Sequence, residues 1–233
     1  MAVTVDLSDS LGGGAVTQTT LSWSHTCGAG CSLLVVGAGN TTNKTVSSVT
    51  YGGVALSFGA SVANGTNREV EAWSLVSPTP GTATITITWS AGARVCGGAI
   101  SFLGTNVATP FGTLVTATGS TNPANVTVTP ADLTLDLLLI ANGAAETLTP
   151  DASQTQQVNV TGNTGGGVNT AVLGMSIKAA GATMQWTQSG SGSPSGYAMI
   201  GIPIFAAAGG LPWRPGGRIY VQNQAAINRA SRY

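Results

Sequence analysis

Short segments in which polar and apolar residues alternate recur along most of the chain, and they constrain its fold more than any other feature. Thr82–Trp89 reads Thr-Ala-Thr-Ile-Thr-Ile-Thr-Trp, which is the period of a strand with one face in a core and the other in solvent. Arg68–Val76 begins with the same period and places Val70 and Ala72 on one face. No segment before residue 209 needs helical spacing to explain it. The chain is therefore predicted to be all-β.

Two near-continuous apolar runs, Leu33–Val36 and Leu135–Ile140, are typical of central strands covered on both faces. Many turn signals separate the predicted strands, as in a β-sandwich or barrel. These signals are Gly52-Gly53, Asn64-Gly65, Pro78–Gly81, Gly97-Gly98, Asn122-Pro123, Asn142-Gly143, Gly165–Gly167 and Gly190–Gly196. The residues predicted to be buried are Leu34, Val36, Trp89, Ile100, Leu138, Ile140, Trp186 and Ile200.

A faint internal repeat divides the body into two similar halves. In the first half, Leu33–Val36 is followed by Trp73–Val76, Thr86–Trp89 and Gly98–Ser101. In the second half, Leu137–Ile140 is followed at similar spacing by Met175–Lys178, Met184–Trp186 and Tyr197–Ile200. Since all-β units of half this size bury little surface, one sandwich built from two similar halves is the preferred interpretation.

The order of these segments resembles a jelly-roll-like β-sandwich module that occurs in bacteriophage virion proteins and bacterial surface proteins. The residues that carry the resemblance are Leu21–His25, Leu33–Val36, Val49–Leu56, Val70–Trp73, Pro80-Gly81, Ile85–Trp89 and Gly98–Phe102. The resemblance covers roughly residues 15–205. It implies a structural or adhesive module, and it carries over no catalytic residue.

Charge is scarce and unevenly placed in this chain. Only 7 % of the 233 residues are charged, although 42 % are hydrophobic, so the chain can bury a core. Residues 1–208 hold all eight acidic residues and four of the eight basic ones, whereas residues 209–233 hold four arginines and no acid. Such asymmetry is typical of an interaction arm. We therefore expect a single antiparallel jelly-roll-like sandwich over residues 1–208 and a basic Gly/Pro-rich arm over residues 209–233.

The arm carries the clearest functional signal in the sequence. Pro212 and Pro215 remove backbone donors, whereas Arg218–Gln222 has the character of a short strand that can be added to a neighbouring sheet. Arginines and large aromatic residues dominate protein interfaces, and the arm lacks a Lys/Arg cluster interleaved with aromatics. A protein partner is therefore preferred over nucleic acid. The predicted partner-binding residues are Trp213, Arg214, Arg218, Tyr220, Arg229, Arg232 and Tyr233.

His25, Cys27, Cys31 and Cys96 form a candidate zinc set. The sequence lacks a paired Cys-x2-Cys knuckle, and buried free cysteine is common, so we expect no metal. A disulfide between Cys27 and Cys31 across the Gly-Ala-Gly turn stays open as an alternative. Because Met1–Leu11 lacks the basic and then apolar pattern of a secretory signal, reduced thiols are expected.

Residues for catalysis are scarce. The chain has one histidine and eight carboxylates, and it contains no Gly-x-Ser-x-Gly elbow. His25 is expected to hydrogen-bond at a strand end. Asp132 and Asp136 are expected to share a strand face about 13 Å apart, and Glu69 and Glu71 are expected on a solvated edge. The protein is therefore predicted not to be an enzyme and to use no cofactor.

Five tryptophans leave two interpretations open. Exposed coplanar rings would form a stacking platform for sugars, whereas Trp89 and Trp186 occupy equivalent strand ends in the two halves and favour core packing. No apolar run is long enough to span a bilayer.

The sequence therefore predicts a bacteriophage virion structural protein, either a capsid decoration or a tail or fibre subunit on the particle exterior, made in the host cytoplasm. Its expected partners are copies of itself or a capsid or tail protein, held through the arm, without membrane or nucleic acid. A carbohydrate-binding adhesion module for a host surface glycan is the alternative. A hydrolase built around His25 is the third hypothesis.

Overall fold

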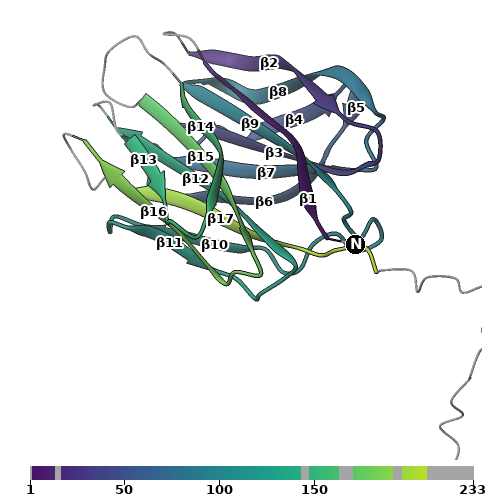
Figure 1. The fold of residues 1–233 in the computed structure, drawn as a ribbon. Coiled ribbons are helices and arrows are strands. Elements are labelled where there is room, and N and C mark those ends of the chain that lie inside the picture. The colour runs from purple at the N-terminus through teal and green to yellow at the C-terminus, as the bar shows by residue number, and fades with distance from the viewer. Residues whose placement is uncertain (1, 14–16, 143–146, 163–169, 191–195, 209–233) are drawn as a thin grey trace, which may run out of the picture.

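A computed structural model describes residues 2–13, 17–142, 147–162, 170–190 and 196–208. These residues form antiparallel β-sheets (Figure 1). The first half contains β1 (Thr4–Gly12), β2 (Gln18–Cys27), β3 (Cys31–Asn40), β4 (Val46–Tyr51), β5 (Val54–Ala55), β6 (Ser57–Ala63), β7 (Glu69–Val76), β8 (Gly81–Ala93) and β9 (Val95–Leu103). The second contains β10 (Val115–Gly119), β11 (Ala124–Thr127), β12 (Leu133–Asn142), β13 (Thr147–Pro150), β14 (Thr155–Gly162), β15 (Thr170–Ala179), β16 (Thr183–Ser189) and β17 (Tyr197–Ile204).

The two halves have the same strand order. The inner sheet of the first half is ordered β1-β9-β3-β7-β6, and that of the second half is ordered β10-β17-β12-β15-β14. The outer sheets are ordered β2-β8-β4-β5 and β11-β16-β13. The repeat seen in the sequence therefore corresponds to equivalent strands, with β3, β7, β8 and β9 matching β12, β15, β16 and β17.

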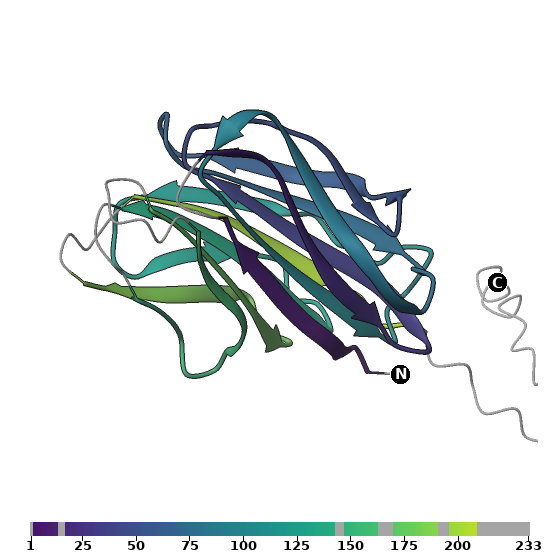
Figure 2. The same ribbon diagram turned by 90° about the horizontal axis from the view of Figure 1, so that it is seen from above.

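Three hydrophobic cores separate the four sheets. One core lies between the sheets of the first half and includes Leu34 and Trp89. Another lies between the sheets of the second half and includes Leu138 and Trp186. The largest joins both halves, because the two inner sheets pack face to face and bury residues from each of them. Figure 2 shows the two halves side by side, seen from above. The sandwich is thus four sheets deep.

The inner sheets pack in a reciprocal pattern. The edge strand β1 contacts β14, and the equivalent edge strand β10 contacts β6, which is the counterpart of β14. Likewise β9 contacts β15 while β17 contacts β7, and the central strands β3 and β12 contact each other. Such reciprocity is the signature of an isologous two-fold interface, here within one chain. The halves are therefore related by an approximate two-fold axis near β3 and β12.

The all-β sandwich predicted from the sequence is confirmed, and the described residues include no helix long and apolar enough to cross a bilayer. Leu34, Trp89, Leu138, Trp186 and the other predicted core residues are at most 2 % exposed. One face of the alternating Arg68–Val76 segment is also as predicted, since Val70 and Ala72 lie in the joint core. The jelly-roll assignment itself stays a prediction.

The predicted turn at Gly97-Gly98 was wrong, because both glycines lie inside β9 and are buried. Their role is to let neighbouring sheets approach. A Cβ on Gly97 would lie 2.8 Å from the Trp23 ring, and one on Gly98 would lie 2.8 Å from Met175 Sδ. By contrast, Gly52-Gly53 forms the predicted turn between β4 and β5, where both residues have positive φ.

Candidate functional site

The predicted partner-binding residues all belong to the arm and lie outside the described residues. They are Trp213, Arg214, Arg218, Tyr220, Arg229, Arg232 and Tyr233. The other candidate residues, which include His25 and the three cysteines, belong to the body.

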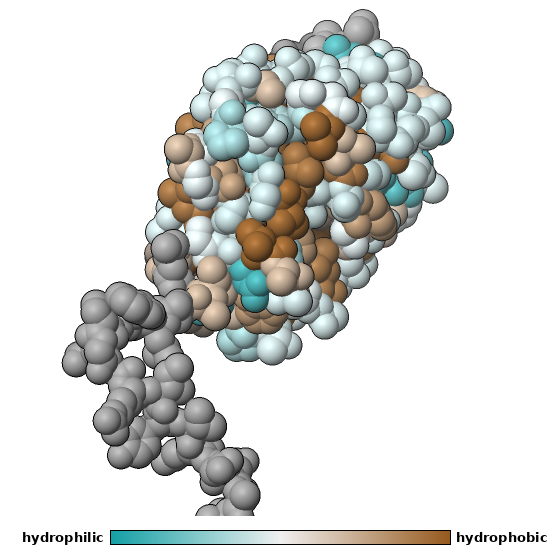
Figure 3. Space-filling view, turned by 90° about the vertical axis from the view of Figure 1, so that its right-hand side faces the viewer, coloured by the Kyte–Doolittle hydropathy of each residue, from teal (hydrophilic) through white to brown (hydrophobic). Residues whose placement is uncertain are grey.

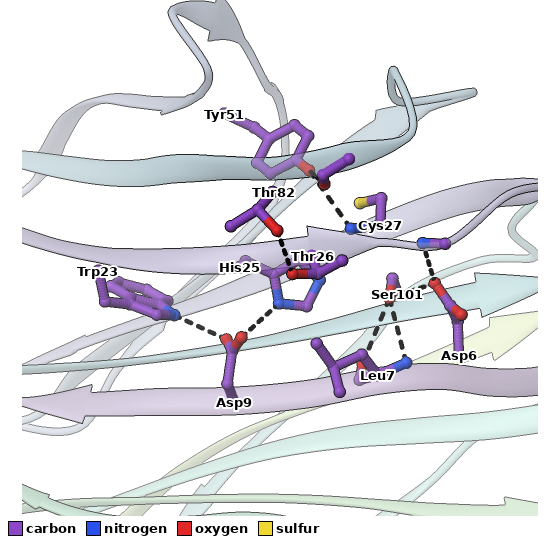
Figure 4. Close-up of polar contacts among 12 residues, drawn as sticks. Asp6, Leu7, Asp9, Trp23, His25, Thr26, Cys27, Tyr51, Thr82 and Ser101 are labelled. Atoms are coloured by element: carbon purple, nitrogen blue, oxygen red, sulfur yellow. Dashed lines mark hydrogen bonds and ion pairs between the residues drawn. The ribbon is translucent and has the colours of Figure 1, made fainter.

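Asp9 on the edge strand β1 connects two aromatic side chains of β2 (Figure 4). Trp23 Nε1 donates to Asp9 Oδ1 at 2.7 Å, and His25 Nδ1 lies 2.7 Å from Asp9 Oδ2. Because an ionised carboxylate only accepts, Nδ1 carries the proton of this bond. The His25 side chain is 0 % exposed and that of Asp9 is 27 % exposed. Asp9 thus fastens the outer sheet to the edge of the inner one.

Asp6 makes a second connection of the same kind. Its Oδ2 accepts the Gly28 backbone N–H at 2.6 Å and the Ser101 hydroxyl at 3.1 Å. Ser101 Oγ also accepts the Leu7 backbone N–H at 3.2 Å. Strand β1 bulges between Val5 and Leu7, and Ser101 Oγ supplies a hydrogen-bond acceptor for the Leu7 backbone N–H at this bulge. Asp6 and Ser101 therefore support backbone at the bulge.

The geometry around His25 matches a hydrolase site only in part. A catalytic histidine holds an acid on one ring nitrogen and a nucleophile on the other. The Asp9–His25 contact supplies the first half of that arrangement, but His25 Nε2 is buried and has no hydrogen-bond partner. Ser101, the hydroxyl drawn beside it in Figure 4, bonds to Asp6 and Leu7 instead. The arrangement therefore holds His25 in place, as expected for a strand-end residue.

The candidate zinc set does not converge. Cys27 and Cys31 lie in the core of the first half, whereas Cys96 faces the joint core on the opposite side of the inner sheet. All three are free thiols, and no cluster of three or more metal-ligating side chains occurs in the part of the chain that the structure describes.

Cys27 and Cys31 form a thiol pair on either side of the Gly28–Gly30 turn. A hydrogen bond between them raises the pKa of Cys27 and lowers the pKa of Cys31. Tyr51 covers the pair: its hydroxyl accepts the Cys27 N–H at 3.3 Å and donates to Gly81 O at 2.6 Å. Burial raises the pKa of Tyr51 to about 12. The two sulfur atoms are thus adjacent but reduced.

The expectation that Glu69 and Glu71 lie on a solvated edge was wrong. Both face the outer sheet from β7, and Glu71 is only 1 % exposed. Its carboxylate accepts the Val46 N–H at 2.7 Å and the Trp73 Nε1–H at 3.1 Å. Burial raises the pKa of both carboxyls. Strand β7 lies inside its sheet, and both faces of that sheet are covered. The alternating residues of β7 therefore point into two different cores, and not into a core and solvent.

Asp136 is a fully buried carboxyl on the central strand β12 of the second half. Its Oδ1 accepts the backbone N–H and the hydroxyl of Ser176 at 2.8 and 2.9 Å. Its Oδ2 accepts Trp186 Nε1 at 2.8 Å and Gln154 Nε2 at 3.4 Å. Burial raises the pKa of Asp136 to about 7, although all four bonds oppose the shift. Asp132 lies just before the strand and accepts the Ala206 N–H at 2.9 Å, so the two aspartates do not form a pair.

Hydrogen bonds from a tryptophan Nε1–H to a carboxylate thus recur in this fold. Trp23 donates to Asp9, Trp73 to Glu71 and Trp186 to Asp136. Trp89 and Trp186 are buried as predicted. On the surface, Phe58 is 54 % exposed and meets Trp73 edge-on, with the ring planes 71° apart. A perpendicular pair offers no flat sugar platform like that of coplanar rings.

A pocket of about 330 Å³ opens at the end of the first half, between the β4–β5 turn and the β7–β8 connection. Tyr51, Leu75, Pro78 and Pro80 contribute to its walls, and Gly52 and Thr79 lie at its rim. No carboxylate, histidine, lysine or arginine is among its lining residues. Its chemistry is therefore suited to an apolar or aromatic group.

Comparison with known proteins gives no assignment: no family model, curated protein or solved structure matches this chain.

Sequence reasoning missed the tryptophan and carboxylate pairs and the end pocket. Two of the pairs join residues 14 and 50 positions apart, which no local spacing reveals, whereas Glu71 and Trp73 lie two positions apart on one face of β7. The pocket had a partial signal, since Pro78 and Pro80 were recognised only as turn residues.

Proposed function

We propose that this protein is a structural subunit of a bacteriophage particle, whose β-sandwich body is joined to neighbouring copies by the basic arm. The observation that carries the proposal is the separation of charge. All eight acidic residues precede residue 209, and four arginines without an acid follow it. Opposite charges on two parts of one chain favour contact between copies.

The use of the body's carboxylates supports a structural role. Asp6, Asp9, Glu71 and Asp136 accept hydrogen bonds from several groups each. Asp132 accepts a backbone N–H, Asp151 accepts from Ser153, and Glu69 accepts from Asn40. Each of these seven carboxylates is thus engaged by the fold itself. The acidic residues hold strands and turns of the four-sheet body in place.

A carbohydrate-binding adhesion module is the second candidate. The exposed ring of Phe58 is the observation that favours it, because sugars stack on aromatic faces, but the perpendicular Trp73 ring adds no second face to that of Phe58. The other described tryptophans are engaged in the sandwich, which supports the structural role more strongly.

Sedimentation velocity of the full chain tests the proposal. We expect concentration-dependent species larger than a monomer, and we expect the four-fold variant Arg214→Gln, Arg218→Gln, Arg229→Gln and Arg232→Gln to shift them to monomer. The matched control removes body cations, Lys44→Gln with Lys178→Gln, and should assemble as the unaltered chain does. Raising the salt concentration should weaken assembly only in part, since apolar anchors and main-chain pairing are not screened. A full chain that stays monomeric at every concentration would overturn the proposal.

A further inference from the structure

The end pocket has a preformed, mainly apolar lining. The Tyr51 ring is fixed because its hydroxyl donates to Gly81 O at 2.6 Å. Pro78 and Pro80 form a stiff wall, since the proline ring fixes φ. A site that needs no reorganisation loses little entropy when it is filled.

An apolar side chain of the pocket lining stays uncovered: Val54 is 52 % exposed. Figure 3 looks onto this end of the molecule and shows a continuous hydrophobic band across it, bordered by polar residues. Such a band is typical of a surface that another segment covers.

The described chain leaves the body at the same end. Ser77, on the pocket wall, donates its N–H to Ser32 O at 2.9 Å. Ser32 Oγ accepts the Thr105 N–H at 3.0 Å, and Thr105 pairs with Ala206. Figure 1 shows the end of β17 emerging on the side where β5 lies. Only the strands β9, β3 and β7 therefore separate the last described residues from the pocket.

The start of the arm is long enough to span the distance from the last described residues to the end pocket. Neighbouring strands lie about 4.8 Å apart, so three spacings amount to about 15 Å. Trp213 follows Ala208 by five residues, which reach about 17 Å when extended. Gly209 and Gly210 allow the chain to turn at the exit. Trp213 can thus reach the pocket of its own chain, and it is the first aromatic residue able to do so.

We propose that the segment Leu211–Pro215 docks on its own body, with the Trp213 ring in the end pocket against Pro78 and Pro80. Proline-flanked segments bind well to aromatic and proline-lined grooves because they lose little entropy on binding. An intramolecular segment also acts at millimolar effective concentration, so modest affinity suffices. This inference rests on the proposed function and deepens it, because docking would direct the remaining residues 216–233, with three arginines, toward a neighbour.

Crosslinking within the full chain tests the docking. Thr79 is exposed at the pocket rim, so Thr79→Cys together with Leu211→Cys places two thiols near each other when the segment is docked. A short bismaleimide should then give a cyclised monomer on a denaturing gel. Thr79→Cys alone controls for the three buried native thiols. Adding Trp213→Ala should lower the yield at least tenfold.

Two equally exposed valines distinguish an effect of the pocket on crosslinking from the general effect of adding a charge to the surface. Val54 and Val107 are both 52 % exposed, but only Val54 lines the pocket. Val54→Asp should abolish the intrachain crosslink, and Val107→Asp should leave it unchanged. Crosslinks that form only between chains, or that persist with Trp213→Ala, would overturn the inference.

Sedimentation of the same samples separates the two proposals. A crosslinked chain that stays monomeric would contradict the proposed function and keep the docking. A chain that assembles but gives no intrachain crosslink would contradict the docking alone.

Discussion

The two halves of this sandwich share a strand order but differ in how they bury polar groups. In the first half, Asp6 and Asp9 lie on the edge strand β1, where the Asp9 side chain is 27 % exposed. In the second half, Asp136 lies on the central strand β12 and is fully buried. A tryptophan donates to the carboxylate in each case. Equivalent strand orders are thus compatible with different polar contacts.

This difference indicates what specifies the fold. The features that the halves share are alternating apolar faces and glycines or turns between strands. Three features differ between the halves: the positions of the carboxylates, the two-residue strand β5 and the cysteines. Strand β5 and all three cysteines belong to the first half. Burial of strand faces therefore specifies the four-sheet order, whereas the polar pairs stabilise each half separately.

The largest expected difference between the halves comes from removing their carboxylates. Asp136→Ala leaves four buried donors around an empty site, and we expect it to lower the free energy of unfolding by about 3–5 kcal/mol. Asp9→Ala acts at an edge that water reaches, and we expect about 1–2 kcal/mol. Urea unfolding measures both. Equal losses would show that burial does not distinguish the two sites.

Replacing a buried tryptophan by phenylalanine removes its indole N–H, so comparing Trp186 with Trp89 measures the hydrogen bond from Trp186 to Asp136. Trp186 Nε1 donates to Asp136, whereas Trp89 Nε1 is buried without a partner. Trp186→Phe should therefore cost about 1.5–3 kcal/mol more than Trp89→Phe, because a hydrogen bond to a charged group is lost. Both variants keep an aromatic ring in a core. A larger loss for Trp89→Phe in urea unfolding would reverse the comparison.

Asp136 in the second half should make the largest single contribution to the pH dependence of stability, to which Glu69 and Glu71 in the first half add with the same sign. Burial raises the pKa of Asp136 to about 7 from an ordinary value of 3.8, so the folded state binds more protons than the unfolded state between these values. Stability is then highest below pH 4 for this group and falls as pH rises to 7. Thermal unfolding should show a decrease in Tm of several degrees over that range. Asp136→Asn should make the profile shallower, and the slope that remains should come from Glu69 and Glu71, whose carboxyl pKa values burial also raises.

The smallest expected effect concerns the thiol pair of the first half. A disulfide reagent should join Cys27 to Cys31 with the loss of two hydrogen atoms to the reagent, because the two thiols are hydrogen-bonded to each other. Cys96 is fully buried on the other face of the sheet and should not react. Mass spectrometry of the peptides checks the pairing. Reaction of Cys96 before the pair would contradict the separation of the two cores.

The sequence predicted those parts of the molecule that depend on local pattern. Alternation located β7 and β8, the apolar runs located β3 and β12, and the repeat located equivalent strands of the two halves. Gly97-Gly98 was misinterpreted because glycine is typical both of turns and of close contacts between sheets, and only the packing of Trp23 and Met175 separates the two.

The candidate sites were less accessible to sequence reasoning. The burial of Glu71 depends on the outer sheet covering β7, which alternation alone does not reveal. The end pocket forms from the β4–β5 and β7–β8 connections, which are about 25 residues apart in sequence. Long-range packing therefore created the features that local patterns could not predict.

Removal of the arm tests the central claim most directly, that the sandwich is the body and residues 209–233 join copies together. Sedimentation velocity would compare the full chain with a chain ending at Ala208, with circular dichroism of each. We predict an unchanged β-sheet spectrum and a shift from larger species to monomer. A truncated chain that assembles as the full chain does would contradict the account and assign assembly to the body surface.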